Sequence, residues 1–279
     1  MNNIYNIFVI VLVTLFTTGI LTLLYMLYEA TNLKVTHIKY NKDAAKDSVL
    51  KIMNISDIHI KFLRVSPEKI AKHIRENNPD IVLLSGDYIE NTSYSPLFIE
   101  FLKRSGITDK PCYGVFGNHD YEAMEYDEDK LQGFIKLMKT NGLHILCDES
   151  IRFEKNKVIY NIIGLRDLRE MKPDYAKAYS NLDITAKMNI VITHNPDTVL
   201  KLPANKTDLI LAGHFHGGQI WFPFKLEYKV FRNEELCMMN ISRGMHHVNG
   251  IDIYINRGLG NVVVPMRFLS RPEILFIEV

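Results

Sequence analysis

Five short apolar runs, each followed at once by a polar cluster, constrain the fold of this chain most strongly. Apolar runs of this length, bounded by turn signals, are typical of buried strands. Helix signals lie between them: Pro67 follows Ser66 at a capped start, and Asn195 stands before Pro196 in the same way. Strands that alternate with helices predict an α/β fold. The five runs occupy residues 50–55, 81–84, 112–116, 188–192 and 208–212.

The polar clusters place histidines and carboxylates where each strand ends. Gly213 ends the last run, so His214 and His216 are expected on a loop at the carboxyl edge of a sheet, where open α/β sheets carry their chemistry. Imidazoles there are natural metal ligands, although two surface histidines in a turn would satisfy this segment alone. We expect all five strands to bring candidate ligands to the same sheet edge. The other four clusters contribute Asp57 with His59, Asp87, Asn118 with His119 and Asp120, and His194.

Together, the five clusters resemble the pattern of calcineurin-like metallophosphoesterases: DxH, GD, GNHD, an isolated His and GHxH, in that order. The resemblance covers residue 50 to the C-terminus and implies a four-layer αββα sandwich. The longer form 213–219 and the tail segments 256–260, 265–268 and 271–273 are similar to a membrane-associated bacterial branch of the family. That branch includes enzymes that act on the pyrophosphate of UDP-2,3-diacylglucosamine.

The resemblance also implies a role for each candidate ligand. Asp57, His59 and His216 would hold one metal ion, Asn118, His194 and His214 the other, and Asp87 would bridge the two. A mixed set of oxygen and nitrogen ligands suits Mn²⁺, Fe or Zn²⁺ better than Mg²⁺ or Ca²⁺, and we expect Mn²⁺. Such a pair would activate a water for attack on phosphorus.

His119 and Asp120 are the expected catalytic residues beside the metals. His119 follows the ligand Asn118 directly, so it is expected to act on the leaving-group oxygen as acid or hydrogen-bond donor. Asp120 would then fix its orientation and tautomer. The alternative for both residues is that their polar side chains cap the loop.

The N-terminal segment predicts a membrane anchor. Residues 1–28 contain no charged side chain, and residues 7–28 are almost wholly apolar, which is long enough to cross a bilayer as a helix. A cleaved signal peptide is the main alternative, but it would have a basic start, a shorter apolar core and a small-residue cleavage site. We therefore expect an anchor over 1–32, a linker over 33–48 and a catalytic domain over 49–279.

The charges that flank this segment predict its orientation. Lysines follow the helix whereas only the terminal amine precedes it, and excess Lys and Arg remain in the cytoplasm. A single-pass protein of the cell membrane with a cytoplasmic catalytic domain is therefore expected. The lysines are Lys34, Lys39, Lys42 and Lys46.

Composition excludes several other classes. The 33 basic and 32 acidic side chains leave a net charge of +1, which predicts no nucleic-acid surface. Three widely spaced cysteines form neither a disulfide framework nor a zinc signature. No feature of the sequence indicates an obligate protein partner.

Substrate contacts are the least determined part. Trp221, Phe222 and Phe224 follow the last metal loop and are expected either to contact an acyl chain or the membrane interface, or to fill the core. Arg257 would meet a phosphate or stand in a surface turn. Tyr94 and Tyr121 are weaker candidates.

Three functions stay open at this point. The first is a membrane-bound hydrolase of a lipid-linked phosphate or pyrophosphate such as UDP-2,3-diacylglucosamine, and the second is a metallophosphoesterase acting on a nucleotide, a protein or a cell-envelope polymer. The third is a membrane scaffold without catalysis, which the intact ligand set disfavours. The bilayer itself is the expected partner, and the anchor favours the first function because it concentrates the enzyme at a lipid substrate.

Overall fold

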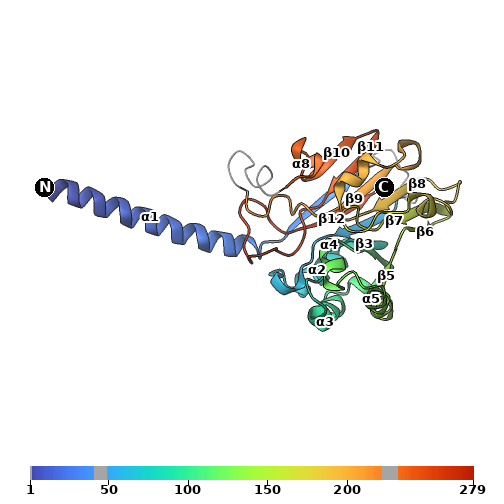
Figure 1. The fold of residues 1–279 in the computed structure, drawn as a ribbon, viewed down its shortest axis with the longest axis horizontal. Coiled ribbons are helices and arrows are strands. Elements are labelled where there is room, and N and C mark those ends of the chain that lie inside the picture. Colours follow the sequence, from blue (N-terminus) through green and yellow to red (C-terminus); the bar gives the residue numbers. More distant parts are fainter. Residues whose placement is uncertain (1, 41–48, 222–231) are drawn as a thin grey trace.

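Two mixed sheets, each of six strands, form the centre of the molecule in the computed structural model, which describes residues 2–40, 49–221 and 232–279 (Figure 1). The first sheet has the strand order β1-β12-β2-β3-β4-β5 and the second β10-β11-β9-β8-β7-β6. The strands are β1 Lys34–Lys39, β2 Lys51–Ile55, β3 Ile81–Ser85, β4 Cys112–Val115, β5 Leu143–Ile145, β6 Glu149–Lys155, β7 Val158–Gly164, β8 Met188–Ile192, β9 Leu209–Ala212, β10 Gly244–Val248, β11 Ile251–Ile255 and β12 Glu273–Glu278.

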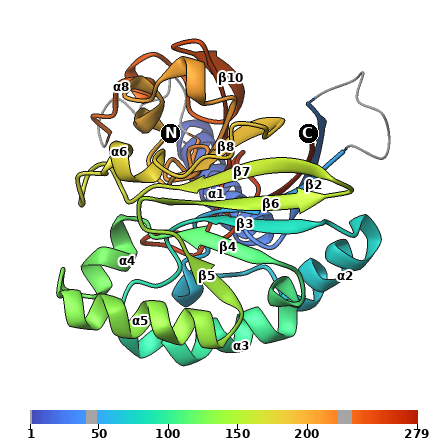
Figure 2. The same cartoon turned by 90° about the vertical axis from the view of Figure 1, so that its right-hand side faces the viewer.

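Helices cover the outer face of each sheet (Figure 2). The helices are α1 Asn2–Glu29, α2 Pro67–Asn77, α3 Ser95–Ser105, α4 Asn118–Ala123, α5 Glu128–Thr140, α6 Tyr175–Ala178 and α8 Glu235–Met238, with the 3₁₀ turns η2 Ile60–Phe62, η3 Thr92–Tyr94, η4 Ile107–Asp109, η5 Pro196–Leu200 and η6 Ala204–Lys206. Helices α2, α3 and α5 lie against the first sheet, and α6 and α8 lie on the far side of the second.

Three apolar cores correspond to the three interfaces of this stack. Side chains of α2, α3 and α5 form one core with the outer face of the first sheet, and those of α6, η5 and α8 form another with the second. The middle core joins the sheets, with Ile52 and Leu83 from one and Ile190 and Leu211 from the other. Strands covered on both faces read as continuous apolar runs, which explains their sequence pattern. The four-layer αββα sandwich is therefore confirmed.

The expectation of a single sheet edge needs correction. β2, β3 and β4 are parallel neighbours in the first sheet, whereas β8 and β9 are parallel neighbours in the second. An apolar run indicates that a strand is buried but not to which sheet it belongs. β2 and β9 lie in different sheets, yet both are covered on both faces and have the same pattern. The candidate ligands therefore come from the carboxyl ends of two packed sheets.

Both helix starts are present. Ser66 precedes α2, whose Ile70 and Ile74 face the core, but its side chain makes no capping hydrogen bond. Asn195 does cap η5, because it accepts a hydrogen bond from the backbone N–H of Asp197 at 3.0 Å. The second start produces a single 3₁₀ turn and a bend rather than a long helix.

Helix α1 projects away from the sheets (Figure 1). The apolar stretch within Asn3–Glu29 has a mean hydropathy of 2.6 and is not buried inside the protein, whereas Glu29 at the end of the helix is buried. By length and composition the helix is able to cross a membrane.

The segment expected as a linker is partly structured. Residues 34–39 form β1, which pairs in parallel with β12 and so belongs to the first sheet; residues 41–48 lie outside the described part of the chain. β1 is an edge strand that is only half covered, and its largely polar sequence is therefore difficult to distinguish from a linker.

Candidate metal centre

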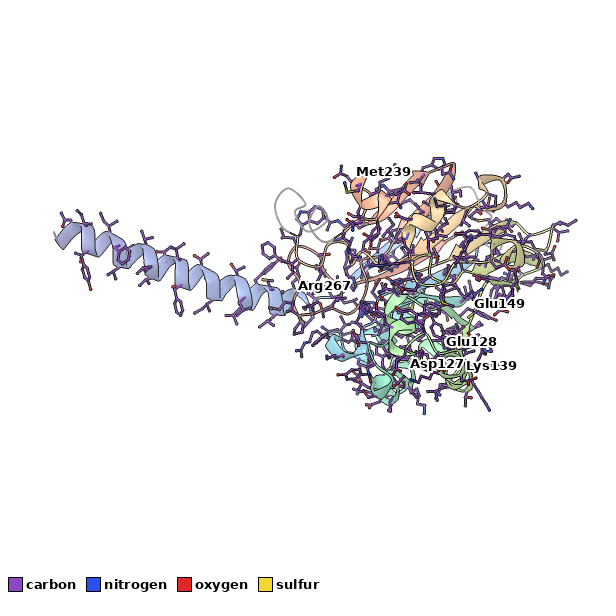
Figure 3. The ribbon with its side chains drawn as sticks, viewed as in Figure 1. Asp127, Glu128, Lys139, Glu149, Met239 and Arg267 are labelled. Atoms are coloured by element: carbon purple, nitrogen blue, oxygen red, sulfur yellow. The ribbon has the colours of Figure 1, made fainter. Side chains whose placement is uncertain are left out.

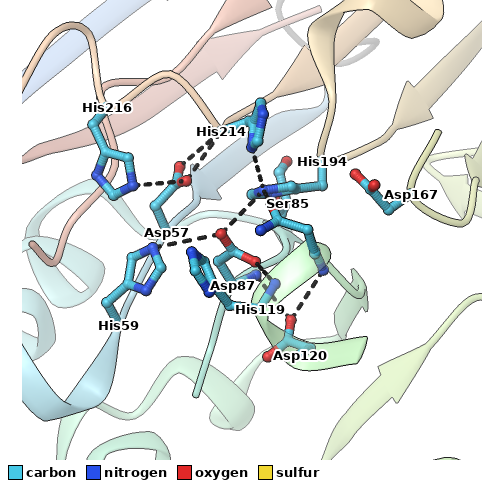
Figure 4. A network of polar contacts seen from close by, with 12 residues as sticks. Asp57, His59, Ser85, Asp87, His119, Asp120, Asp167, His194, His214 and His216 are labelled. Carbon is cyan, nitrogen blue, oxygen red and sulfur yellow. Dashed lines mark hydrogen bonds and ion pairs between the residues drawn. The ribbon is translucent and has the colours of Figure 1, made fainter. Parts of the chain in front are cut away.

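The carboxyl ends of five strands converge on one buried site (Figure 4). Asp57 and His59 follow β2, Asp87 follows β3, Asn118 opens α4 just after β4, His194 follows β8, and His214 and His216 follow β9. Two groups of three have ligand atoms within 4.8 Å of one another, and all six residues are buried: Asp57 with His59 and His216, and Asp87 with His194 and His214.

Asp87 belongs to the second group and also faces the first. Its Oδ2 atom lies 3.1 Å from His194 Nε2 and 3.5 Å from His59 Nε2, so one carboxylate faces both. Asn118 Oδ1 lies 3.2 Å from His194 Nε2, which places this amide beside the second group. The structure thus brings all seven candidate ligands together.

The donor set fits divalent cations. Among the described residues, His59 Nε2 and His216 Nδ1 are buried without a hydrogen-bond partner, a situation that native proteins rarely tolerate. Both residues belong to the first group, which also contains Asp57. A cation bound there would supply the missing partner for both imidazoles.

The backbone of the site is held in uncommon conformations. Five candidate ligands have positive φ angles between 39° and 73°, namely Asp57, His59, Asp87, His214 and His216. Side chains other than glycine adopt this region at a cost, and such residues gather at functional sites.

Two glycines allow the loops to approach each other. A Cβ on Gly213 would lie 2.5 Å from Asp57 Oδ2, and one on Gly117 would collide with the Asp87 carboxylate. Each glycine therefore lets one ligand loop pass close to a carboxylate of another, which no larger residue would permit.

A set of outer partners orients the imidazoles. Glu90 Oε1 lies 3.0 Å from His59 Nδ1, Glu234 Oε1 lies 2.9 Å from His214 Nε2, and the Ser85 carbonyl oxygen lies 2.9 Å from His194 Nδ1. Each partner occupies one ring nitrogen and leaves the other toward the centre, as is usual for metal-binding histidines.

Sequence reasoning missed these outer residues. Glu90 follows Asp87 by three positions in the same loop, which is a usable signal, but nothing in the spacing links Glu234 to His214. Asp167 was also missed: it is buried beside His194, and its Oδ2 atom has no hydrogen-bond partner among the described residues (Figure 4).

Charge and burial tune the centre in opposite directions. Burial acts to raise the pKa of the Asp87 carboxyl, but His194 and His59 outweigh it and hold that pKa well below its usual range. Burial lowers the pKa of His214 to about 3 and also depresses the pKa of His216, so both rings are neutral and able to donate a lone pair. Burial would also lower the pKa of His194, yet Asp87 raises it to about 10.

His119 lies at the rim of the site. Its ring centroid is 5.2 Å from that of His59, its backbone N–H donates to Asp87 Oδ1 at 2.9 Å, and its side chain is 30% exposed. The ring therefore faces the metal groups while it remains open to solvent.

The expected partnership of His119 with Asp120 needs correction. The Asp120 carboxylate is fully buried and accepts four backbone N–H groups, from Asp87, Tyr88, Ile89 and Gly117. His119 Nδ1 instead lies 2.9 Å from Glu122 Oε2, one helical turn further along α4. The side chains at positions i and i+3 of a helix share a face, whereas adjacent ones do not, which explains why Glu122 and not Asp120 is the partner of His119. Asp120 ties two ligand loops together.

The expected substrate residues lie outside the two ligand groups. Arg257 makes an ion pair with Glu273 at 3.8 Å and packs beside Gly217, and Trp221 packs on the outer core of the second sheet beneath the guanidinium of Arg243. Tyr94 lies in η3 near Lys61, and Tyr121 is buried. Phe222 and Phe224 lie outside the described residues.

Comparison with known proteins agrees with this geometry. Residues 50–218 match the model of the calcineurin-like phosphoesterase family. The metallophosphoesterase YkoQ of Bacillus subtilis is 32% identical over 95% of this chain and 98% of its own length. The UDP-2,3-diacylglucosamine pyrophosphatase LpxG of Chlamydia trachomatis is 24% identical over 88% of this chain and 89% of its own.

A solved structure, the NAD nucleotidase of Haemophilus influenzae, aligns with a TM-score of 0.49 at 17% identity, over 76% of this chain and 45% of the other. The family match covers most of the catalytic domain and includes the five strand-end clusters. The chain belongs to the calcineurin-like phosphoesterase family and is a metal-dependent hydrolase.

Proposed function

We propose that this protein is a membrane-anchored phosphohydrolase with a dinuclear metal centre, and that it cleaves a phosphoester or pyrophosphate bond of a lipid-linked substrate. The observation that carries the proposal is the pair of buried ligand groups, with the Asp87 carboxylate facing both. One group holds Asp57, His59 and His216, and the other holds Asp87, His194 and His214, with Asn118 beside it.

Two divalent cations bound there, with Mn²⁺ as the first candidate and Fe or Zn²⁺ as others, would polarise a phosphoryl oxygen and lower the pKa of a bound water. The chain supplies the rest of the chemistry. Asp87 would balance the charge of both cations, and Glu90 and Glu234 fix the ring orientations of His59 and His214. Asp120 keeps the loop of Asp87 in register with the loop of Asn118.

His119 is proposed to act on the leaving group. Because Glu122 binds its Nδ1 atom, its Nε2 atom is left to donate a proton to the departing oxygen. Its position at the open rim suits this role, since a leaving group must exit toward solvent.

The membrane part of the proposal rests on α1, whose apolar stretch is not buried inside the protein. Lys34 and Lys39, which follow it, favour a cytoplasmic catalytic domain. A lipid-linked substrate agrees with the anchor and with the similarity to the LpxG proteins, named for UDP-2,3-diacylglucosamine. Arg257 and Trp221 stay the candidates for substrate contact, although the partners of each support a structural role equally well.

The test uses the full-length protein in detergent with Mn²⁺ and compares UDP-2,3-diacylglucosamine with UDP-glucosamine. Cleavage of the pyrophosphate should release UMP, and the acylated substrate should have a kcat/KM roughly 10- to 100-fold higher, because each buried CH₂ contributes about 0.8 kcal/mol. Equal kcat/KM values for the two substrates would contradict the proposal of a lipid-linked substrate. Hydrolysis of bis-p-nitrophenyl phosphate would still show the phosphohydrolase, so the two parts of the proposal are tested separately.

A further inference from the structure

Residues 262–269, here called the apolar loop, expose hydrophobic side chains next to the end of α1. Val263 is 80% exposed and Leu269 is 51% exposed, and the other apolar side chains of the loop are only partly covered: Val262, Val264, Pro265, Met266 and Phe268. Single exposed hydrophobic residues are ordinary, but a continuous run of them marks an interaction site.

The two most exposed side chains of the loop also stand on strained backbone. Val263 has a φ of 64° and Leu269 a φ of 56°. This region is uncommon for residues other than Gly, Asn and Asp, and it is a clear outlier for a β-branched residue such as valine. Strained backbone and exposed hydrophobic surface both cost free energy, and such features gather at functional and binding sites.

The backbone of the apolar loop is suited to an apolar partner because most of its polar groups have hydrogen-bond partners within the protein. The Gln219 amide donates to the carbonyl oxygens of Val262, Val264 and Met266 at 3.0–3.1 Å and accepts from the Val262 N–H at 2.7 Å. The N–H groups of residues 264, 266, 267, 268 and 269 also have acceptors in the protein. Backbone that meets lipid needs this internal pairing, since hydrocarbon offers no hydrogen bonds.

The apolar loop is continuous with the surface of α1. The Arg267 N–H donates to the Met26 carbonyl oxygen at 3.1 Å, and the Leu269 N–H donates to Glu29 Oε2 at 2.7 Å. Tyr25 and Phe268 meet edge to face with ring centroids 5.9 Å apart. Tyrosines at the end of a spanning helix mark the membrane interface, so the loop lies at that depth.

We propose that the apolar loop is a second contact with the lipid bilayer, in which Val263 and Leu269 enter the membrane interface beside α1. The inference rests on α1 being the membrane anchor. The 27 residues of the apolar helix span about 40 Å, which exceeds the roughly 30 Å of a hydrocarbon core. The last turns of the helix, which contact the apolar loop, therefore lie in the membrane interface.

This contact sets how the metal centre faces the membrane. The fully buried Arg267 lies where α1 meets the catalytic domain (Figure 3) and donates to the carbonyl oxygens of Arg257, Gly258 and Gly260. The Gly260 N–H in turn donates to the Asp57 carbonyl oxygen at 2.7 Å, so only a few bonds separate the loop from a candidate metal ligand. The metal centre is thereby held in a fixed orientation relative to the bilayer, instead of moving freely on a flexible linker.

The test is lipid photo-crosslinking with the full-length protein in phosphatidylcholine vesicles. The photo-reactive residue p-benzoylphenylalanine replaces Val263, Ile10 in α1, or Ile184 in separate variants. Ile184 is the matched control because it is 98% exposed and neighbours Asp183, which pairs with Arg152 of β6 on the side of the domain away from α1 (Figure 1). We expect lipid adducts from positions 263 and 10 and at least tenfold fewer from position 184.

The outcomes separate the two claims. Adducts at position 10 without adducts at position 263 overturn the loop contact and leave the anchor intact. Equal yields at 263 and 184 also overturn it, because exposure alone would then explain the adducts. Adducts at neither 10 nor 263 overturn the anchor and with it the inference that depends on it.

Discussion

At the residue scale, His119 and Glu122 carry the most specific chemical claim. His119→Ala should keep its metal ions but reduce the hydrolysis rate by roughly 10²–10⁴-fold, the usual contribution of an acid–base group. Glu122→Gln should cause a smaller loss, because it removes the partner of Nδ1 but not the imidazole. Rates measured with alkyl and p-nitrophenyl esters check this, since p-nitrophenolate leaves without a proton. The same loss on both esters would contradict the role of proton donor.

Asp120 carries a structural claim that differs from the one its sequence position suggests. Asp120→Asn exchanges one acceptor oxygen for an amide, which cannot accept the backbone N–H groups that this oxygen now receives. Buried donors left without a partner cost about 1–3 kcal/mol each, so the thermal midpoint should fall clearly. Asp127→Asn is the matched control, because Asp127 caps the exposed start of α5 and asparagine caps nearly as well. Equal midpoints for the two variants would show that Asp120 does not hold the loops.

The individual ligands were predictable at this scale, but their surroundings were not. Strand-end carboxylates and imidazoles are visible in sequence because each sits directly after an apolar run. Glu122, Glu234 and Asp167 are not, since their relation to the site depends on a helix face or on chain segments that meet only after folding.

Among the elements, the apolar loop is expected to lower the stability of the protein through its strained backbone, in return for contact with the membrane. Val263→Asn and Leu269→Asn together should raise the free energy of unfolding in detergent by about 1 kcal/mol, because asparagine tolerates positive φ better than valine or leucine. For a domain of this size that corresponds to an increase of about 2–4 °C in Tm. Val264→Asn is the control, since Val264 is not among the positions with positive φ. A lower Tm in the double variant would contradict the claim of strain.

Elements with a strong pattern were predicted well and those with a weak pattern were not. Five strands are covered on both faces and are therefore recognisable in the sequence as apolar runs: β2, β3, β4, β8 and β9. β1 is a half-covered edge strand whose polar residues resemble a linker, and its pairing with β12 joins two ends of the chain more than 200 residues apart. Local sequence carries no information on such a pairing.

For the whole molecule, the apolar helix α1 predicts an integral membrane protein with one orientation. The full-length chain should resist extraction by salt or carbonate and require detergent, because we propose that α1 crosses the bilayer. Protease added to intact cells should leave the catalytic domain whole and should digest it after the membrane is permeabilised. Digestion from outside intact cells would overturn the cytoplasmic placement.

Two metal sites that share the Asp87 carboxylate should bind two ions per chain, so the number of bound ions shows whether they exist. Full-length protein loaded with Mn²⁺ and freed of excess metal should retain about two ions per chain, because two ligand groups meet at Asp87. Asp87→Ala should retain fewer than one ion and lose hydrolysis of bis-p-nitrophenyl phosphate. Asp252→Ala, which alters a carboxylate paired with Tyr40 and His247, should retain both ions. Two firmly bound ions in Asp87→Ala would contradict the shared-carboxylate centre.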